Sequence, residues 1–178
     1  MSKIRFGRLL AVQAVVLGVF VMTFAQAASA FLGEMKNEGT GLCMTSLGTH
    51  TKGAPAEQWT CNGSVNQQWI SSTEPFGGNL LINEGDGWCL NNRAGGASNN
   101  NNQIMWPCPG TPVFNMEYLT SGGGPNGSFK MAADGSNFKP NGYCVTSDGN
   151  KTVGSGVNEF SCNSSPNQYW SGPVIIEQ

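Results

Sequence analysis

The chain is poor in the residues on which most catalytic and metal sites depend. It has one histidine, His50, and only 11% of its 178 residues are charged. It contains no Gly-x-Ser-x-Gly and no Cys-x-x-Cys motif, and its Asp and Glu residues are scattered along the sequence. These absences argue against a serine hydrolase, a zinc site and a two-carboxylate glycosidase. We therefore expect no enzymatic activity, no metal and no cofactor.

Helical periodicity is also missing once the first 30 residues are set aside. Residues 1–30 have a basic start, an apolar run at Leu9–Phe24 and a small-residue cleavage site at Ala28–Ala30, which is typical of a cleaved secretory signal. An uncleaved anchor is the alternative, but the run is shorter than the ~20 residues that span a membrane. We expect a secreted, extracellular protein, or a periplasmic one if it is bacterial, with no membrane insertion after cleavage.

Removal of residues 1–30 leaves 148 residues, which is enough for one domain. This part holds six Lys and Arg against 11 Asp and Glu, a net charge of −5. An acidic balance argues against nucleic acid or an anionic membrane as a partner.

Three copies of one pattern fill residues 31–178: a Gly-x-Cys, a second cysteine 18 or 19 residues later, and a polar closer that ends in an aromatic residue. Repetition at a nearly fixed period indicates a repeat architecture. We place the repeats at about residues 31–76, 77–124 and 125–178. The copies are Gly41–Cys43 with Cys61 and Asn66–Trp69, Gly87–Cys89 with Cys108 and Asn115–Tyr118, and Gly142–Cys144 with Cys162 and Asn167–Trp170. The first two copies also share an Asn-Glu-Gly motif, at Asn37–Gly39 and Asn83–Gly85.

Between the cysteines, short apolar patches alternate with turn signals, which favours strands over helices. Many short strands at regular spacing predict an all-β barrel or sandwich. The run Asn99–Asn102 is interpreted as a solvated loop. We expect strands at residues 80–82, 129–131 and 174–176, and tight turns at Asp86-Gly87, Asp134-Gly135, Asn141-Gly142 and Asp148-Gly149.

Six cysteines in an exported chain predict a disulfide framework. Other pairings are possible in principle, but the near-constant spacings favour pairing within each repeat. The expected bonds are Cys43 with Cys61, Cys89 with Cys108, and Cys144 with Cys162.

The repeated Gly-x-Cys, second cysteine and Gln-x-Trp closer resemble the ricin B-chain-like family of lectins. Gln67–Trp69 and Gln168–Trp170 match the family's closer, whereas the middle copy, Met116–Tyr118, keeps only the aromatic residue. The resemblance covers residues 31–178 and implies a β-trefoil with pseudo-threefold symmetry and one disulfide in each lobe. In that fold we expect the closing aromatics, Trp69, Tyr118 and Trp170, to fill a shared core.

A neutral sugar needs an aromatic face for its C–H surface and planar polar groups for its hydroxyls. The resemblance implies an aromatic platform two residues before each second cysteine and hydroxyl-binding amides at the start of the closer. The candidates are Trp59, Asn66 and Gln67 in the first repeat, Trp106 and Asn115 in the second, and Phe160, Asn167 and Gln168 in the third.

The family's binding repeats place an aspartate two residues after the first cysteine, where this chain has Thr45, Asn91 and Thr146. A carboxylate makes strong charge-assisted bonds to hydroxyls, so its loss predicts weak sites. We expect Asn91 and Asp148, which lies two positions after Thr146, to compensate in part. Several weak sites on one chain gain avidity on a glycan-coated surface.

Two functions follow from these patterns. The first is a secreted carbohydrate-binding protein with up to three sites for the glycans of glycoproteins, glycolipids or polysaccharides. The alternative is a degenerate trefoil that binds a protein partner, as a toxin accessory subunit or an inhibitor-like effector does.

Overall fold

The computed structural model describes residues 31–74, 78–93, 98–108, 117–120, 128, 130–134 and 140–172. Several expectations fall wholly or partly outside these residues: the signal at 1–30, Asn115, the side chain of Tyr118, the turn at Asp134-Gly135 and the strand at 174–176.

The described elements are short antiparallel strands with two 3-10 helices, as the turn-rich sequence predicts. Within the described residues, no helix is long and apolar enough to span a membrane. The elements are β1 (Phe31–Glu34), β2 (Lys36–Asn37), β3 (Cys43–Thr45), β4 (Glu57–Trp59), η1 (Val65–Gln67), β5 (Gln68–Glu74), β6 (Gly78–Asn83), β7 (Cys89–Asn92), β8 (Asn101–Trp106), β9 (Glu117–Thr120), β10 (Lys130–Asp134), β11 (Pro140–Ser147), β12 (Ser155–Ser161), η4 (Pro166–Gln168) and β13 (Trp170–Ser171).

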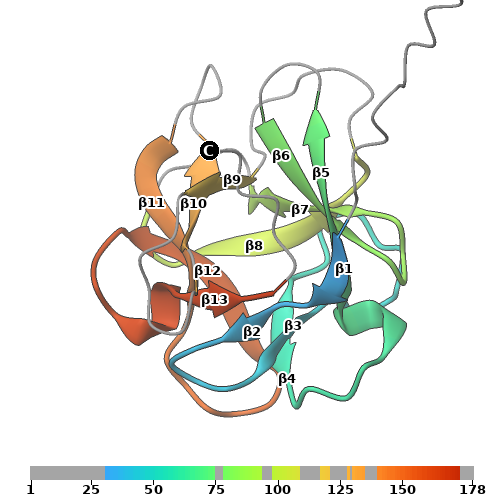
Figure 1. Cartoon of the computed structure of the whole chain (residues 1–178), viewed down its shortest axis with the longest axis horizontal. Helices are drawn as coiled ribbons and strands as arrows, with labels where there is room; N and C mark the ends of the chain where they lie inside the picture. Colours follow the sequence, from blue (N-terminus) through green and yellow to red (C-terminus); the bar gives the residue numbers. More distant parts are fainter. Residues whose placement is uncertain are drawn as a thin grey trace, which may run out of the picture.

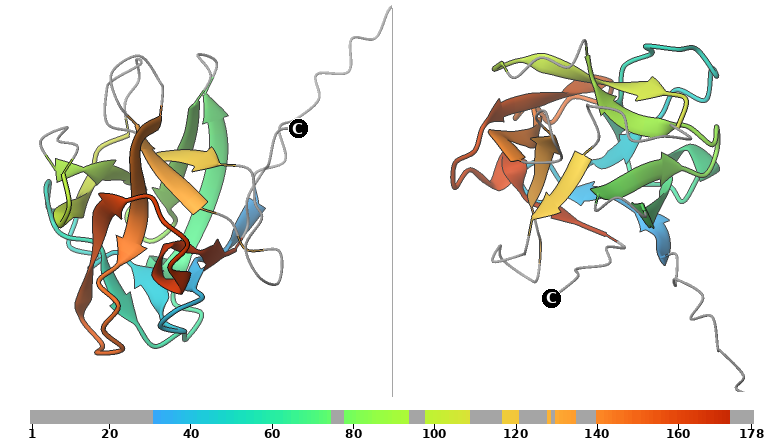
Figure 2. Two further views of the ribbon diagram at one scale, coloured as in Figure 1. Left: turned by 90° about the vertical axis from the view of Figure 1, so that its left-hand side faces the viewer. Right: turned by 90° about the horizontal axis from the view of Figure 1, so that it is seen from above.

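The strands form one continuous antiparallel network that returns on itself. Its main path runs β1-β5-β6-β7-β8-β12-β4-β3-β2-β13, and β11, β10 and β9 branch from β12. Strand β12 joins the lobes, because it pairs with β11, β8 and β4 (Figure 1). Strand β13 pairs with β2, which brings the two ends of the described chain side by side. The expected all-β trefoil is confirmed, and Figure 2 shows its strands wrapping around a common centre from two further sides.

Core residues occupy the same positions relative to the cysteines in each repeat. Met44, Leu90 and Val145 each follow the first cysteine of a repeat, and all three are buried in one cluster. Trp69 and Trp170 are completely buried in the same cluster, as expected for closers. Their indole Nε1 atoms donate hydrogen bonds to the carbonyls of Met44 and Val145, each at 3.0 Å. Each indole therefore fills the core and leaves no unpaired donor there.

Three equivalent turns, at residues 51–54, 98–101 and 152–155, lock neighbouring repeats together. Each turn closes with a hydrogen bond between its first and last residues. Its third residue has a positive φ and donates its main-chain N–H to a strand of another repeat. These bonds run from Gly53 to Met105, from Asn100 to Glu159, and from Gly154 to Gln58, at 2.8–2.9 Å.

The Asn-Glu-Gly motifs also join repeats, a role that the sequence did not predict. Asn37 and Asn83 are completely buried. The Nδ2 of Asn83 donates to the carbonyls of Asn66 and Gln68 in the preceding closer, and its Oδ1 accepts from the hydroxyl of Ser46. Because such bonds satisfy both ends of a buried amide, each motif fixes the start of its repeat to the closer of a neighbouring repeat, the first for Asn83 and the third for Asn37.

Two local predictions were wrong. Residues 101–102 of the expected Asn99–Asn102 loop begin strand β8, because pairing with Asn158 and Glu159 of β12 holds this polar segment in the sheet. The expected turn at Asn141-Gly142 lies inside β11. Gly142 does have the positive φ of a turn glycine, 85°, but the chain uses it where the pairing of β10 with β11 shifts register. The strand at 80–82 is confirmed within β6.

Candidate functional site

The three platforms, Trp59, Trp106 and Phe160, occupy equivalent places near the ends of β4, β8 and β12. Each pairs across the sheet with the first cysteine of its own repeat. The residue before each platform is buried, so strand alternation turns the aromatic outward. Trp59 is 43% exposed, Trp106 is 36% exposed, and Phe160 is half-buried. All three therefore present ring surface at the outside of the trefoil.

A pocket of about 220 Å³ opens beside Phe160 in the third repeat. Its lining brings together four residues that the sequence predicts for this site: Asp148, Phe160, Asn167 and Gln168. Asp148 is exposed, and its Oδ1 accepts a hydrogen bond from the main-chain N of Asn150 at 2.8 Å. That bond turns the loop after β11 so that a carboxylate stands at the pocket in the absence of the family's usual aspartate.

The closer glutamines lie behind the platforms and are buried. Gln67 accepts from the main-chain N of Asn62 at 2.8 Å and donates to the hydroxyl of Thr45 and the carbonyl of Thr60. Gln168 repeats this arrangement with Thr146 as its hydroxyl partner, at 3.1 Å. Both amides thus make their hydrogen bonds within the protein. They fix the hydroxyls of Thr45 and Thr146, which stand where the resemblance implies an aspartate. Direct contact of the amides with a ligand stays a prediction.

The closer asparagines are wedged between glycines of two repeats. A Cβ on Gly48 would lie 2.6 Å from Nδ2 of Asn66, and a Cβ on Gly85 would overlap its Oδ1. Asn66 and Asn167 are half-buried, and Asn167 lines the pocket beside Phe160. The equivalent glycines around Asn167 are Gly149 and Gly39.

The second repeat differs from the other two at its platform. The ammonium Nζ of Lys52 lies 4.0 Å from the centroid of the Trp106 ring, in a cation–π contact. Asn91 is almost completely buried on β7, opposite Ile104 of β8. Asn115 lies outside the described residues. Of the polar residues predicted for this site, only Asn91 falls among the described residues, and it is buried.

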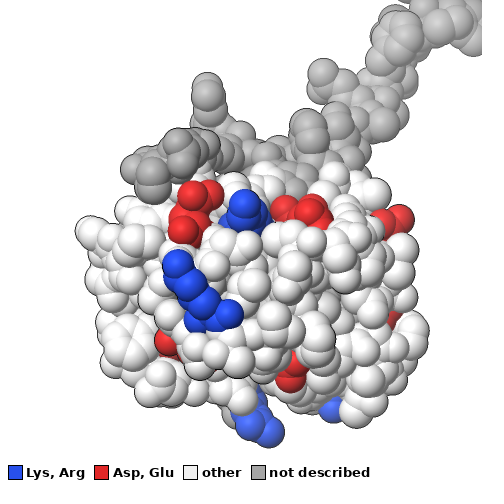
Figure 3. Space-filling model, turned by 90° about the horizontal axis from the view of Figure 1, so that it is seen from below, with Lys and Arg blue, Asp and Glu red and all other residues white. Residues whose placement is uncertain are grey.

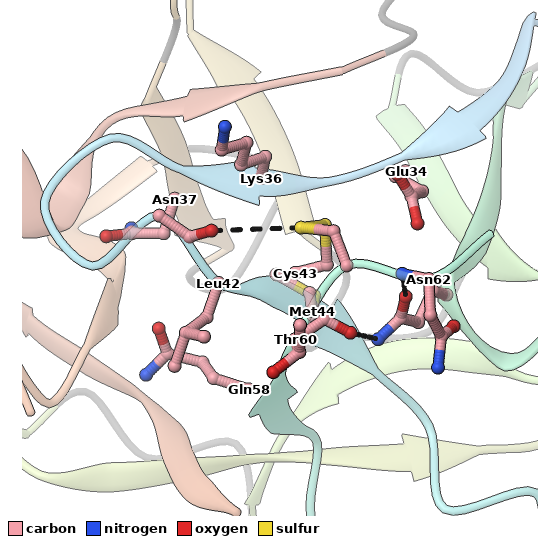
Figure 4. The surroundings of a disulfide bond; sticks show 12 residues. Glu34, Lys36, Asn37, Leu42, Cys43, Met44, Gln58, Thr60 and Asn62 are labelled. Atoms are coloured by element: carbon pink, nitrogen blue, oxygen red, sulfur yellow. Dashed lines mark hydrogen bonds between the residues drawn. A yellow bond between two sulfur atoms is a disulfide. The ribbon is translucent and has the colours of Figure 1, made fainter. Parts of the chain in front are cut away.

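All three disulfides form within single repeats, which confirms the expected pairing. Figure 4 shows the surroundings of the Cys43–Cys61 bond, where Glu34 and Asn62 lie to one side of it. Among the described residues, one group of potential metal ligands exists, formed by Glu34 with Cys43 and Cys61. Its sulfur atoms are bonded to each other and are not thiolates, so this group does not make a metal site.

One unusual acidic residue was missed by the sequence analysis. Glu159 on β12 is completely buried, and among the described residues neither of its carboxylate oxygens has a hydrogen-bond partner of good geometry, although the Asn101 side chain and the Ser98 backbone lie near it. Burial raises its pKa to about 7, and the opposing effects of the Asn101 side chain and the Ser98 backbone are smaller. The available signal was positional: Glu159 stands three residues before its second cysteine, where the first repeat has Gln58.

Charged side chains are sparse on the face shown in Figure 3, where basic and acidic groups lie among a mostly uncharged surface. This face offers no continuous basic surface of the kind that holds a nucleic-acid backbone.

The sequence profile of the ricin-type beta-trefoil lectin domain matches residues 31–170. This chain belongs to that family. No curated protein shows significant sequence similarity to this ricin-type lectin domain.

Solved structures of the same fold include natural lectins, a designed protein and a module of an enzyme. The designed threefold-symmetric protein ThreeFoil has a TM-score of 0.69 at 19% identity, over 81% of this chain and 99% of that one. The Macrolepiota procera ricin B-like lectin, in complex with lactose, has a TM-score of 0.65 at 15% identity, over 82% and 96%. An exo-beta-1,3-galactanase from Clostridium thermocellum has a TM-score of 0.67 at 19% identity, over 84% of this chain but only 31% of that one. At these identities the likeness shows the fold alone.

Proposed function

We propose that this ricin-type lectin domain is an exported protein that binds carbohydrate and catalyses no reaction. The pocket beside Phe160 carries the proposal, because it combines an aromatic face, amide groups and a carboxylate in one hollow. These are the groups that a neutral sugar ring requires. The lactose bound to the Macrolepiota procera lectin agrees with a saccharide ligand for this fold.

In this pocket each residue has a distinct task. The Phe160 ring covers the C–H face of the sugar, and the carboxylate of Asp148 accepts hydrogen bonds from its hydroxyls. Asn167, which also lines the pocket, contributes a further polar contact. Gln168 acts from behind by holding Thr146 and the carbonyl of Ser161 in place.

Binding and its location are tested together with residues 31–178, produced with their disulfides intact. A glycan array identifies a ligand, and calorimetry then measures its affinity for variants of the third-repeat pocket. We expect Phe160→Ala and Asp148→Asn each to weaken binding about tenfold, as the loss of one stacking or charge-assisted contact of ~1.4 kcal/mol implies. Val65→Ala is the matched control, because Val65 is 57% exposed on η1 and does not line the pocket.

The alternative function, contact with a protein partner, predicts a different pattern. A blank array from a folded protein, together with a stoichiometric protein companion that free sugars do not displace, would replace the carbohydrate proposal with this one. Equal affinity of Phe160→Ala and the parent protein would move the site away from the third repeat.

A further inference from the structure

The three platforms have different charged groups around them. The residues responsible occupy corresponding positions in the three repeats. One such position is the second residue of each interlocking turn, which lies next to the turn's positive-φ residue. It is Val153 in the turn beside Trp59, Lys52 in the turn at Trp106, and Asn99 in the turn that meets β12 near Phe160. One turn therefore offers an apolar group, the next a cation and the third an amide.

The turn fixes where Lys52 stands. Gly53 donates its main-chain N–H to the carbonyl of Met105 at 2.9 Å, and Met105 donates back to Ala54 at 2.7 Å. These two bonds clamp the 51–54 turn against β8 immediately before Trp106. The ammonium of Lys52 is thereby kept over the ring, 4.0 Å from its centroid, although its side chain is exposed.

A second position reinforces the contrast. The residue four places after the first cysteine is Asp148 in the third repeat, where it lines the pocket. The same place holds Arg93 in the second repeat and Leu47 in the first, and both are exposed. Within the described part of the chain, neither Lys52 nor Arg93 has an ion-pair partner.

The strand position two residues before the platform is acidic in the first repeat and uncharged in the second. In the first repeat it is Glu57, whose Oε2 accepts a hydrogen bond from Nε1 of Trp59 at 3.1 Å. In the second repeat it is Ile104, which is buried and uncharged. The Trp59 platform thus carries a carboxylate at its edge, whereas the Trp106 platform has two cations and no carboxylate at the equivalent positions.

We propose that the Trp106 platform is selective for acidic sugars, those that carry a carboxylate or a sulfate, with Lys52 and Arg93 as the residues that determine this specificity. An incoming anion draws the Lys52 ammonium from the ring face toward itself, and the freed indole covers the C–H face of the sugar. Arg93 then binds the anion through its planar fork of donors. The same anion is disfavoured at Trp59 by Glu57 and at the third-repeat pocket by Asp148. The inference rests on the proposed function, because it names the ligand class of one of its sites.

The experiment uses residues 31–178 and two matched pairs of oligosaccharides. One pair is oligogalacturonate with neutral galactose oligomers, and the other is sulfated with unsulfated galactose oligomers. Calorimetry and quenching of tryptophan emission report binding at low and at physiological salt. We expect the acidic member of at least one pair to bind more tightly, with an advantage that shrinks as salt rises. The pair that shows the advantage tells whether carboxylate or sulfate is the preferred anion.

Variants assign the selectivity to the two cations. Lys52→Met and Arg93→Gln are each expected to lower affinity for the acidic member by about threefold to fivefold, the range of an exposed ion pair. Affinity for the neutral member should not fall. Lys36→Met is the matched control, because it removes an exposed lysine from β2, which pairs with neither β7 nor β8.

The outcomes separate the two proposals. Equal affinity for both members of both pairs, or an acidic preference that survives in Lys52→Met and Arg93→Gln, overturns the selectivity while the lectin function stands. Binding of no saccharide, neutral or acidic, by a folded protein overturns both.

Discussion

Asn37 donates its side-chain Nδ2 to the main-chain carbonyl of Asn167, 130 residues further along the chain, at 2.8 Å. Its Oδ1 meanwhile accepts from the main-chain N of Thr40 and the hydroxyl of Ser147. One buried amide therefore joins the first repeat to the closer of the third, so that the three repeats contact one another around the pseudo-threefold axis. Asn83 makes the corresponding bond to Asn66, also at 2.8 Å, between the first and second repeats.

Asn37→Ala should destabilise the protein strongly. The substitution leaves several buried polar partners without a hydrogen bond, and each costs ~1–3 kcal/mol, so we expect the free energy of unfolding to fall by ~3 kcal/mol or more. Denaturant unfolding measures it. Asn150→Ala is the control, because Asn150 makes its hydrogen bonds in an exposed turn. Equal stability of the two variants would show that Asn37 does not stabilise the contact between the first and third repeats.

The wedging of Asn66 between glycines gives a second stability prediction. Gly85 has an ordinary φ, so Gly85→Ala strains no backbone, but the new methyl group would overlap Oδ1 of Asn66. We expect a loss of ~1–3 kcal/mol, as for other overpacked sites. In Gly156→Ala the nearest atom to the new Cβ is 3.5 Å away, so this variant should unfold close to the parent. Thermal unfolding of the two variants side by side tests the prediction, and matching midpoints would contradict it.

The two kinds of tryptophan should respond differently to substitution by phenylalanine. Trp170→Phe removes the buried indole N–H and leaves the carbonyl of Val145 unpaired, at a cost of ~1–3 kcal/mol or more with the lost packing. Trp59→Phe removes only an exposed hydrogen bond to Glu57, so the change should stay within ~0.5 kcal/mol. Urea midpoints distinguish the two. A large loss in Trp59→Phe would mean that Trp59 is part of the core.

The sequence was informative wherever a residue's role follows from its phase in the repeat. The cysteine spacing gave the disulfides, and the closers gave Trp69 and Trp170 as core residues, because a pseudo-threefold axis places equivalent residues in equivalent surroundings. The exposure of Trp59 and Trp106 was expected from the family resemblance, which implies an aromatic platform two residues before each second cysteine.

Contacts between repeats were not predictable from one repeat at a time. The polar residues 101–102 look like a loop by composition, and only their pairing with β12 of the third repeat makes them strand. Lys52 belongs to the first repeat and acts at the platform of the second, a relationship that no local pattern contains.

The buried carboxyl of Glu159 makes stability depend on pH. Its pKa is raised from 4.5 in the unfolded chain to about 7 in the fold, so the folded protein binds the extra proton between these values. The stabilisation is therefore fully present below pH 4.5 and is lost as pH rises through 7, by ~3 kcal/mol in all. Thermal midpoints from pH 5 to pH 8 should fall in the parent protein, whereas Glu159→Gln, which cannot ionise and copies Gln58 of the first repeat, should show a much flatter profile. Parallel profiles for the two proteins would assign the dependence to other groups.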